Sequence, residues 1–339
     1  MKELLKELCL INGTSGDESL VRNAIIEKIK DFCEYRVDNL GNLICFCKGK
    51  KSSDKKLMIA AHMDEVGFIV TYIRDDGTLC FNEVGGIDTS VVIGRQVKVG
   101  KDGISGVVGS TAIHNLSKEQ RETPPKYGDM YIDIGASSKE EAEQIVNLGD
   151  SVYFSSEFVE LGGNCVKAKA IDDRAGCAAM IQLIREGMEY DTYFVFNVQE
   201  EVGLRGSMVS AFSVAPDFAI VLEATTASDI EGVSGAKRVC CLGKGPVVGF
   251  MDRSTLYDKE LYRMAFKIAD ELEIPCQTKT MIAGGNDSGA IHISRGGVRT
   301  IAVSVPCRYI HSPSCVINTE DFENTLILTR ELAKRIYEL

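Results

Sequence analysis

The stretch that decides the fold lies in the second half of the chain, where CAAMIQLIREGM (177–188) is followed by YFVFNVQ (193–199) and FAIVLEA (218–224). The first has apolar residues at helical spacing, and the other two are almost continuously apolar. Such runs are typical of strands buried on both faces of a sheet, and their alternation with amphipathic helices indicates an α/β fold. RTIAVSVP (299–306) and TEDFENTLILTRELAKRIYEL (319–339) continue the pattern.

The N-terminal part of the chain has the same character. LVRNAIIEKIKDF (20–32) has a helical period, and LMIAA (57–61) is strand-like. From about residue 70 to 160 the chain is dense in Gly, Val and Asp, with short apolar runs and frequent turn signals, which is typical of all-β structure. We therefore predict one α/β domain with a mixed sheet flanked by helices, formed by residues 1–69 and 161–339. A smaller β-rich domain is inserted at residues 70–160.

One stretch of the insert differs from its β-rich surroundings. SSKEEAEQIVNLG (137–149) has a helical pattern and predicts a helix. Ser138 is its expected N-cap, and Glu141, three residues later, completes a capping box.

Composition excludes several classes of protein. The net charge of -11 argues against a nucleic-acid partner, because phosphate binding needs a basic face. The sequence contains no run of about 18 apolar residues, so we expect no membrane span. The first 20 residues lack the apolar core and cleavage site of a signal peptide, so we expect a cytoplasmic location. In that setting the 12 cysteines are expected to be reduced and mostly structural.

Ionisable side chains follow four of the apolar runs. They are His62 and Asp64 after LMIAA, Glu200 and Glu201 after YFVFNVQ, Glu223 after FAIVL, and His311 after IAVSVPCRYI. The pair Asp172–Asp173 precedes the helix that begins near Cys177. Ligands of open α/β sheets bind at the carboxyl ends of the strands, so we expect these side chains to meet at one site.

Each of these residues alone has an ordinary structural explanation, such as a hydrogen-bonded histidine, a solvated Glu-Glu pair or a helix cap. Their combination indicates a metal site, because carboxylates in one cleft repel unless a cation lies between them. His, Asp and Glu without Cys suit Zn, Co or Mn. Five such ligands exceed the need of one tetrahedral zinc and fit two metals that share a bridging carboxylate. Glu200, beside a ligand, is the candidate general base.

Six stretches, in order along almost the whole chain, resemble the M42 family of metallopeptidases, which includes the tetrahedral, self-compartmentalising aminopeptidases and the glutamyl aminopeptidases. The stretches are AAHMDEVGF (60–68), AIDDRAGC (170–177), NVQEEVGLRGS (197–207), VLEATTASD (221–229), AGGNDSGAIH (283–292) and RYIHSP (308–313). The resemblance implies a di-metal exopeptidase fold whose β-rich insert is a PDZ-like dimerisation domain. It also implies a homo-oligomer, a dodecamer built from dimers.

The resemblance further implies a role for each site residue, and two divalent metal ions per subunit. His62 and Glu223 match ligands of the first metal, Glu201 and His311 those of the second, Asp172 (or Asp173) the bridging carboxylate, Glu200 the general base, and Asp64 the acid that orients His62. Many members carry Asp where this chain has Glu223. Glu is longer by one methylene group, so the resemblance does not fix how the Glu223 carboxylate approaches the metal. Zinc is the expected metal, with cobalt and manganese as alternatives.

We therefore predict a metallo-aminopeptidase that hydrolyses N-terminal residues from short peptides by a two-metal-activated water. A di-metal amidohydrolase or deacylase, or a carboxypeptidase-type exopeptidase, is the alternative, and Arg308 or Arg174 could anchor a C-terminal carboxylate. An endoglucanase fits less well, because a glycosidase needs two carboxylates and no metal. A non-catalytic scaffold would lack a ligand or Glu200. Asp287, in a Gly-rich loop, is a candidate for lining the substrate pocket.

Overall fold

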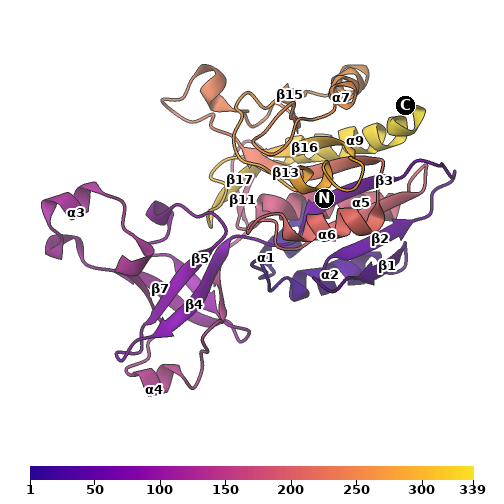
Figure 1. Cartoon of the computed structure of the whole chain (residues 1–339). Helices are drawn as coiled ribbons and strands as arrows, with labels where there is room; N and C mark the ends of the chain where they lie inside the picture. Colours follow the sequence, from indigo (N-terminus) through magenta and orange to yellow (C-terminus); the bar gives the residue numbers. More distant parts are fainter.

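The apolar runs form the centre of a mixed eight-stranded sheet in the computed structural model, which describes residues 1–339 (Figure 1). In sheet order the strands are β1 (Glu34–Val37), β2 (Leu43–Cys47), β12 (Thr192–Asn197), β3 (Leu57–His62), β13 (Phe218–Thr226), β16 (Arg299–Cys307), β14 (Val247–Val248) and β15 (Gln277–Thr278). The central strands β12, β3, β13 and β16 are parallel, whereas β2 and β14 run antiparallel to their central neighbours. The predicted mixed α/β sheet is confirmed.

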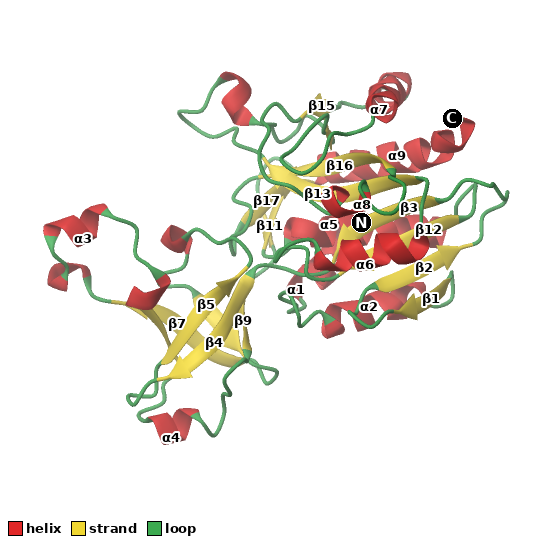
Figure 2. Ribbon diagram, in the orientation of Figure 1, coloured by secondary structure: helices red, strands yellow, loops and turns green.

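Helices cover both faces of this sheet (Figure 2). The larger core cluster contains residues of α1 (Lys2–Leu10), α2 (Ser19–Ile29), α5 (Ile171–Glu186), α7 (Lys259–Glu271) and α9 (Thr319–Arg335), and the smaller one residues of α6 (Arg205–Val214) and α8 (Ser288–Ile291). Leu57, Ile59 and Ala61 of β3 belong to the larger cluster, and Met58 and Ala60 to the smaller one. Successive side chains of a strand point to opposite faces, so burial on both faces explains the continuous apolar runs. None of the helices combines the length and apolar composition that crossing a bilayer requires.

The β-rich insert forms a closed barrel beside the α/β layers (Figure 2). Its strands, in order around the barrel, are β4 (Gly67–Ile73), β5 (Leu79–Val84), β8 (Met130–Asp133), β7 (Ile104–Ser110), β6 (Gln96–Val99) and β9 (Ser151–Phe154). The barrel encloses a separate core cluster that includes Phe68, Phe81 and Phe154. A separate sheet has three strands, β10 (Val159–Glu160), β11 (Cys165–Ala168) and β17 (Cys315–Asn318). Two short helices, α3 (Lys118–Glu122) and α4 (Lys139–Ala142), lie at the periphery of the barrel (Figure 1).

The helix predicted at 137–149 is much shorter than expected, because only Lys139–Ala142 is α-helical. Ser138 is the N-cap, and its hydroxyl accepts the backbone N–H of Glu141 at 3.3 Å. The Glu141 carboxylate bonds to Ser137 rather than to Ser138, so the capping box is incomplete. Further along, the Asp150 carboxylate accepts the backbone N–H of Asn147 at 2.8 Å. Such side-chain bonds compete with helical ones and favour a turn.

Candidate active site

His62 and Glu223 lie on the same face of the central sheet. His62 is the last residue of β3, and Glu223 lies within the parallel neighbour β13. Each continues the alternate positions whose side chains pack in the smaller core cluster. His62 Nε2 lies 3.7 Å from Glu223 Oε2. The prediction that this strand ends at Glu223 was wrong, because β13 stays paired with β16 as far as Thr226.

Asp172 lies between the two histidines. It is near the start of α5, where the backbone of Asp172 and Asp173 departs from helical angles. Asp172 Oδ1 lies 3.3 Å from His62 Nε2, and Asp172 Oδ2 lies 3.4 Å from His311 Nε2. Asp173 Oδ1 instead accepts the backbone N–H of Gly176 at 2.8 Å. Of the two aspartates, only Asp172 contacts both imidazoles.

His311 belongs to the loop between β16 and β17 and has a positive φ of 58°. Its Nδ1 donates to the carbonyl of Gly86 at 2.7 Å, and its Nε2 lies 3.4 Å from Glu201 Oε2. Gly86 follows β5, so the barrel side of the molecule orients this ring. Because Nδ1 is used in that bond, Nε2 is the ring nitrogen left to interact with Asp172 and Glu201. Neither the contact nor its glycine has a local signal in the sequence.

Asp64 joins the His62 and Glu200 segments. Its backbone carbonyl accepts the Nδ1 proton of His62 at 3.0 Å, which leaves Nε2 free on the site side. Its carboxylate accepts the backbone N–H groups of Glu200 at 3.0 Å and Glu201 at 3.1 Å, and the hydroxyl of Ser15 at 2.6 Å. Burial opposes ionisation of Asp64, but the interaction with His62 and the other donors hold its pKa below the usual value. Asp64 therefore holds the Glu200–Glu201 turn as an ionised anchor.

The surroundings of the three glutamates in the site oppose ionisation of their carboxyl groups. Burial, reinforced by neighbouring negative charge, raises the pKa of Glu200 and Glu223 well above the usual value and that of Glu201 to about 7. The pKa of Asp172 is lowered, because the two histidines outweigh its burial. Burial would lower the pKa of His311, but its acidic neighbours raise it to about 10. A bound cation would relieve this repulsion between carboxylates.

The arrangement of donor atoms fits divalent cations. The ligand atoms of His62, Asp173 and Glu223 lie within 4.8 Å of one another, and so do those of His62, Asp172 and Glu201. Glu223 Oε1 and Asp173 Oδ2 are buried without a hydrogen-bond partner. Buried carboxylate oxygens require a partner, and a metal ion supplies one. Imidazole nitrogen and carboxylate oxygen are the ligands that zinc and similar divalent metals accept.

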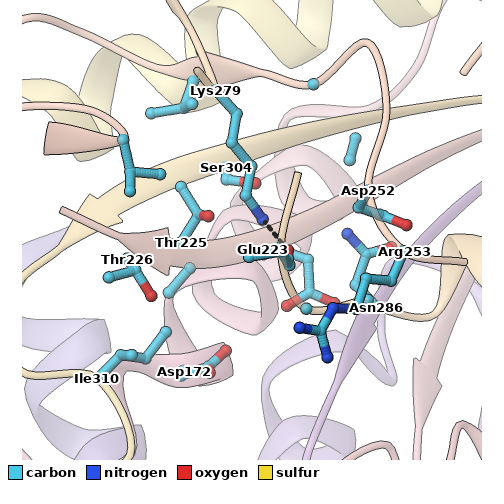
Figure 3. A pocket seen from close by; sticks show the side chains of 18 of the residues that line it. Asp172, Glu223, Thr225, Thr226, Asp252, Arg253, Lys279, Asn286, Ser304 and Ile310 are labelled. Atoms are coloured by element: carbon cyan, nitrogen blue, oxygen red, sulfur yellow. Dashed lines mark hydrogen bonds between the residues drawn. The ribbon is translucent and has the colours of Figure 1, made fainter. Parts of the chain in front are cut away.

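A cavity of about 750 Å³ opens next to these ligands (Figure 3). Asp172, Glu200, Glu201, Glu223 and His311 line one side of it. The other side consists of side chains from loops and short strands, and its basic members are Lys237, Arg253 and Lys279. Sequence reasoning missed these three, because an isolated Lys or Arg in a loop has no pattern that reveals which cavity it faces.

Neither arginine proposed as an anchor for a C-terminal carboxylate is free. Arg174 is fully buried, and its guanidinium donates to the backbone carbonyls of Met63 and Leu8 at 2.8 and 2.6 Å. Arg308 makes a two-point contact with Asp229, with both N–O distances at 2.7 Å. The carboxypeptidase alternative therefore loses its expected anchors.

Asp287 does not line the cavity, contrary to the prediction. Its side chain is fully buried and accepts the amide of Asn197 at 2.7 Å. The preceding residues Gly284, Gly285 and Asn286 line the cavity instead. The Gly-rich loop was correctly associated with the pocket, but the wrong residue was chosen, because Asp287 turns inward at the start of α8.

Known proteins are similar to this chain in sequence and in architecture. Residues 41–328 match the family described as M42 glutamyl aminopeptidase. A putative aminopeptidase of Acetivibrio thermocellus is 43% identical over 98% of both chains. Lysyl aminopeptidase of Pyrococcus furiosus is 34% identical, covering 98% of this chain and 97% of the relative. The solved TET1 peptidase of Pyrococcus horikoshii superposes with a TM-score of 0.86 at 36% identity, over 98% of both chains. The chain belongs to the M42 family of peptidases and is a hydrolase that acts on peptide bonds.

Proposed function

We propose that the chain is an aminopeptidase that removes N-terminal residues from short peptides and uses two divalent metal ions per subunit. The observation that carries the proposal is Asp172, whose two carboxylate oxygens face one histidine each. A carboxylate placed in this way suits a bridge between two cations. The outer positions next to each histidine hold one further carboxylate, Glu223 on one side and Glu201 on the other.

We assign His62 and Glu223 to one metal, Glu201 and His311 to the other, and Asp172 to both. Zinc is the proposed metal, with cobalt or manganese as alternatives, since all three accept imidazole and carboxylate ligands. When bound, two such ions polarise a carbonyl oxygen and lower the pKa of a shared water. Asp64 holds the His62 ring and the Glu200–Glu201 turn in register with each other.

Glu200 is the proposed general base. It is half-buried beside the assigned ligands, and desolvation of its carboxylate raises its pKa, which makes the carboxylate a better proton acceptor. In this role its carboxylate takes a proton from the attacking water and later gives it to the nitrogen of the leaving peptide. The free amine of the substrate would lie among the acidic groups of the site, which explains selection for an N-terminus.

The other enzyme classes receive less support. The two arginines that we expected to anchor the terminal carboxylate of a carboxypeptidase substrate, Arg174 and Arg308, are engaged elsewhere. A deacylase would act on a blocked amine and would gain nothing from these acidic groups. The full set of ligands and Glu200 is present, so a non-catalytic scaffold is not favoured. A glycosidase needs two carboxylates and no metal, so a set of five metal-ligand candidates does not favour that class.

We further propose that the α/β part of the chain, predicted as residues 1–69 and 161–339, is the catalytic domain. The barrel, predicted as residues 70–160 and beginning with β4 at Gly67, is the proposed PDZ-like dimerisation domain. The similar TET1 peptidase assembles into a tetrahedron or a large octahedral shell. By analogy, this chain would form a homo-oligomer, a dodecamer built from dimers. The family is described by a glutamyl aminopeptidase, whereas the relative from Pyrococcus furiosus is a lysyl aminopeptidase. Membership of the family therefore does not decide which N-terminal residue is preferred.

Chelation tests the function directly. Dialysis against a strong chelator should abolish hydrolysis of an aminoacyl p-nitroanilide, and Zn, Co or Mn should restore it. The N-acetylated form of the same anilide is the control and should not be hydrolysed before or after metal addition. Full activity in protein shown by elemental analysis to be metal-free would contradict the metal mechanism. Equal turnover of the acetylated substrate would contradict the aminopeptidase assignment.

A further inference from the structure

A second cavity, of about 490 Å³, adjoins the active-site cavity at His311. Gly86, Ile310 and His311 line both cavities, so the two meet beside the proposed metal ligands. In the view of Figure 3, Ile310 and Asp172 lie at the end of the first cavity away from Lys279. Sites for small molecules have volumes of about 300–1,000 Å³. The second cavity is therefore large enough for part of a peptide and lies next to the groups of the proposed reaction.

The walls of the second cavity come from two distant parts of the chain. The segment between β5 and β6 forms the wall on the barrel side and supplies Arg95. Residues 309–314, in the loop between β16 and β17, form the other wall and include His311. The bond from His311 Nδ1 to the Gly86 carbonyl at 2.7 Å joins the two walls. A substrate bound at His311 thus has a second cavity beside it, into which the part after the cleaved bond can extend.

Arg95 brings a free guanidinium to this cavity. Its side chain is exposed, and its Nε donates to the carbonyl of Val91 at 2.9 Å. The four N–H donors of its two terminal nitrogens bind no group of the chain, and the arginine pairs with no carboxylate, unlike Arg308. The one Asp or Glu of the cavity is Asp88, whose carboxylate accepts the backbone N–H of Ser90 at 2.8 Å and does not pair with Arg95. Two free terminal nitrogens suit two-point bonding to a carboxylate.

Tyr309 lines the same cavity from the opposite wall. It is 56% exposed and has a positive φ of 58°, a conformation that costs free energy for any residue except glycine. The hydroxyl of Ser312 donates to its carbonyl at 2.6 Å and so supports this conformation. An exposed aromatic side chain held on strained backbone beside a site is typical of a binding surface rather than of a packed core.

We propose that the second cavity receives the leaving part of the peptide and that Arg95 binds its C-terminal carboxylate, so that the enzyme favours very short peptides with a free C-terminus. This inference rests on the proposed function, because it places the substrate amine and scissile carbonyl at the ligands. The first side chain then lies in the 750 Å³ cavity, and the rest of the peptide passes His311. A longer peptide carries its carboxylate beyond Arg95, and a C-terminal amide lacks the charge.

The most direct test compares X-Ala with X-Ala-amide, where X is the N-terminal residue whose p-nitroanilide the enzyme hydrolyses fastest. The same comparison is made for X-Ala-Ala and X-Ala-Ala-Ala. For at least one of these lengths, the wild-type kcat/KM of the acid should exceed that of the amide by about threefold to thirtyfold, since Arg95 is exposed and its ion pair is partly screened. The ratio should fall toward one for longer peptides and at high salt.

Variants of Arg95 then assign the effect to this residue. Arg95→Gln should bring the acid/amide ratio to within about twofold of one, and Arg95→Lys, which keeps the charge but loses the two-point geometry, should retain part of it. Arg121→Gln is the matched control. Arg121 is an exposed arginine of α3 whose Nε also donates to a local carbonyl, that of Leu116 at 3.1 Å, and it lies outside this cavity, so the ratio should not change. Damage to the wall would slow acid and amide alike, so the ratio separates recognition from damage.

Each outcome decides between the two proposals. If acids and amides are hydrolysed equally well at every length, the inference fails while the aminopeptidase function stands. If the acid is preferred but Arg95→Gln keeps that preference, another cation binds the carboxylate and the inference fails. If Arg95→Gln instead alters only the ratio of X-Glu-amide to X-Gln-amide, Arg95 recognises an acidic side chain and the inference also fails. If metal-loaded protein hydrolyses no aminoacyl anilide and no peptide, the proposed function itself is wrong.

Discussion

The two sides of the active-site cavity are built from different kinds of structure. Except for His311, which lies in the loop between β16 and β17, the ligand side uses residues in or directly beside the central elements β3, β12, β13 and α5. His62, Asp172 and Glu223 are buried. The opposite wall uses loops and short strands between residues 228 and 286, and Lys237 and Arg253 on it are exposed. The two sides therefore differ in the function that we propose for them. Rigid elements hold most groups of the proposed reaction, whereas the loops line the space proposed for the first side chain of the substrate.

The largest expected effect comes from the ligand side. Glu200→Gln keeps the size of the side chain but removes its ability to accept a proton, so kcat should fall by about a hundredfold to ten-thousandfold. The order of preference among Glu, Gln, Leu and Lys p-nitroanilides should not change, because the wall is untouched. Steady-state kinetics on this panel would check both statements.

A changed order of preference in Glu200→Gln would break the proposed division between the two sides. Lys279→Gln is the converse case, since it removes a charge from the wall and should change the order of preference while metal content stays at the wild-type level. Near-normal turnover in Glu200→Gln would mean that another group accepts the proton.

The smallest effect on turnover is expected from Glu18, which bonds to the backbone of Gln199 next to the proposed general base. Glu18 is 5% exposed, and its carboxylate accepts the backbone N–H groups of Gly16 at 2.8 Å and Gln199 at 3.1 Å. Burial raises its pKa from 4.5 to about 7. The folded state therefore binds this proton more tightly than the unfolded state, so wild-type stability falls as the pH rises from about 4.5 to 7.

Glu18→Gln should remove that loss. Relative to wild type, the variant should be more stable at pH 8 than at pH 5, by at most about 3 kcal/mol. Both proteins should be unfolded by urea in the presence of chelator, so that metal binding does not contribute, and kcat of the metal-loaded variant should be nearly unchanged. A stability difference that is the same at both pH values would show that Glu18 does not titrate in this range.

Much of the ligand side could be predicted from the sequence, because the apolar pattern of buried strands and the parallel pairing of neighbouring strands locate its residues. Burial on both faces makes strands such as β3 and β13 continuously apolar, and polar residues such as His62 and Glu223 interrupt that pattern where a site is built. Parallel neighbours then bring those positions to one edge. The end of β13 was misjudged because strand length depends on pairing with β16, which is a tertiary property.

The wall could not be predicted in the same way. Lys279 and Asp287 both lie in irregular segments, and their sequences do not reveal that Lys279 faces the cavity while Asp287 is buried against Asn197. Arg174 was likewise misjudged, since a fully buried arginine bonded to backbone carbonyls looks like any other arginine beside an acidic motif. Loop conformation depends on contacts with distant parts of the chain, which local patterns do not encode.

The measurement that tests the central claim most directly is metal content per chain, by elemental analysis, for wild type, Glu200→Gln and Glu201→Gln. The two variants make the same chemical change at adjacent positions. Wild type and Glu200→Gln should each bind two metal ions, and Glu201→Gln should bind fewer because it loses a ligand. Two metals in Glu201→Gln together with metal loss in Glu200→Gln would reverse the assignment. Fewer than two metals in fully loaded wild type would contradict the two-metal site.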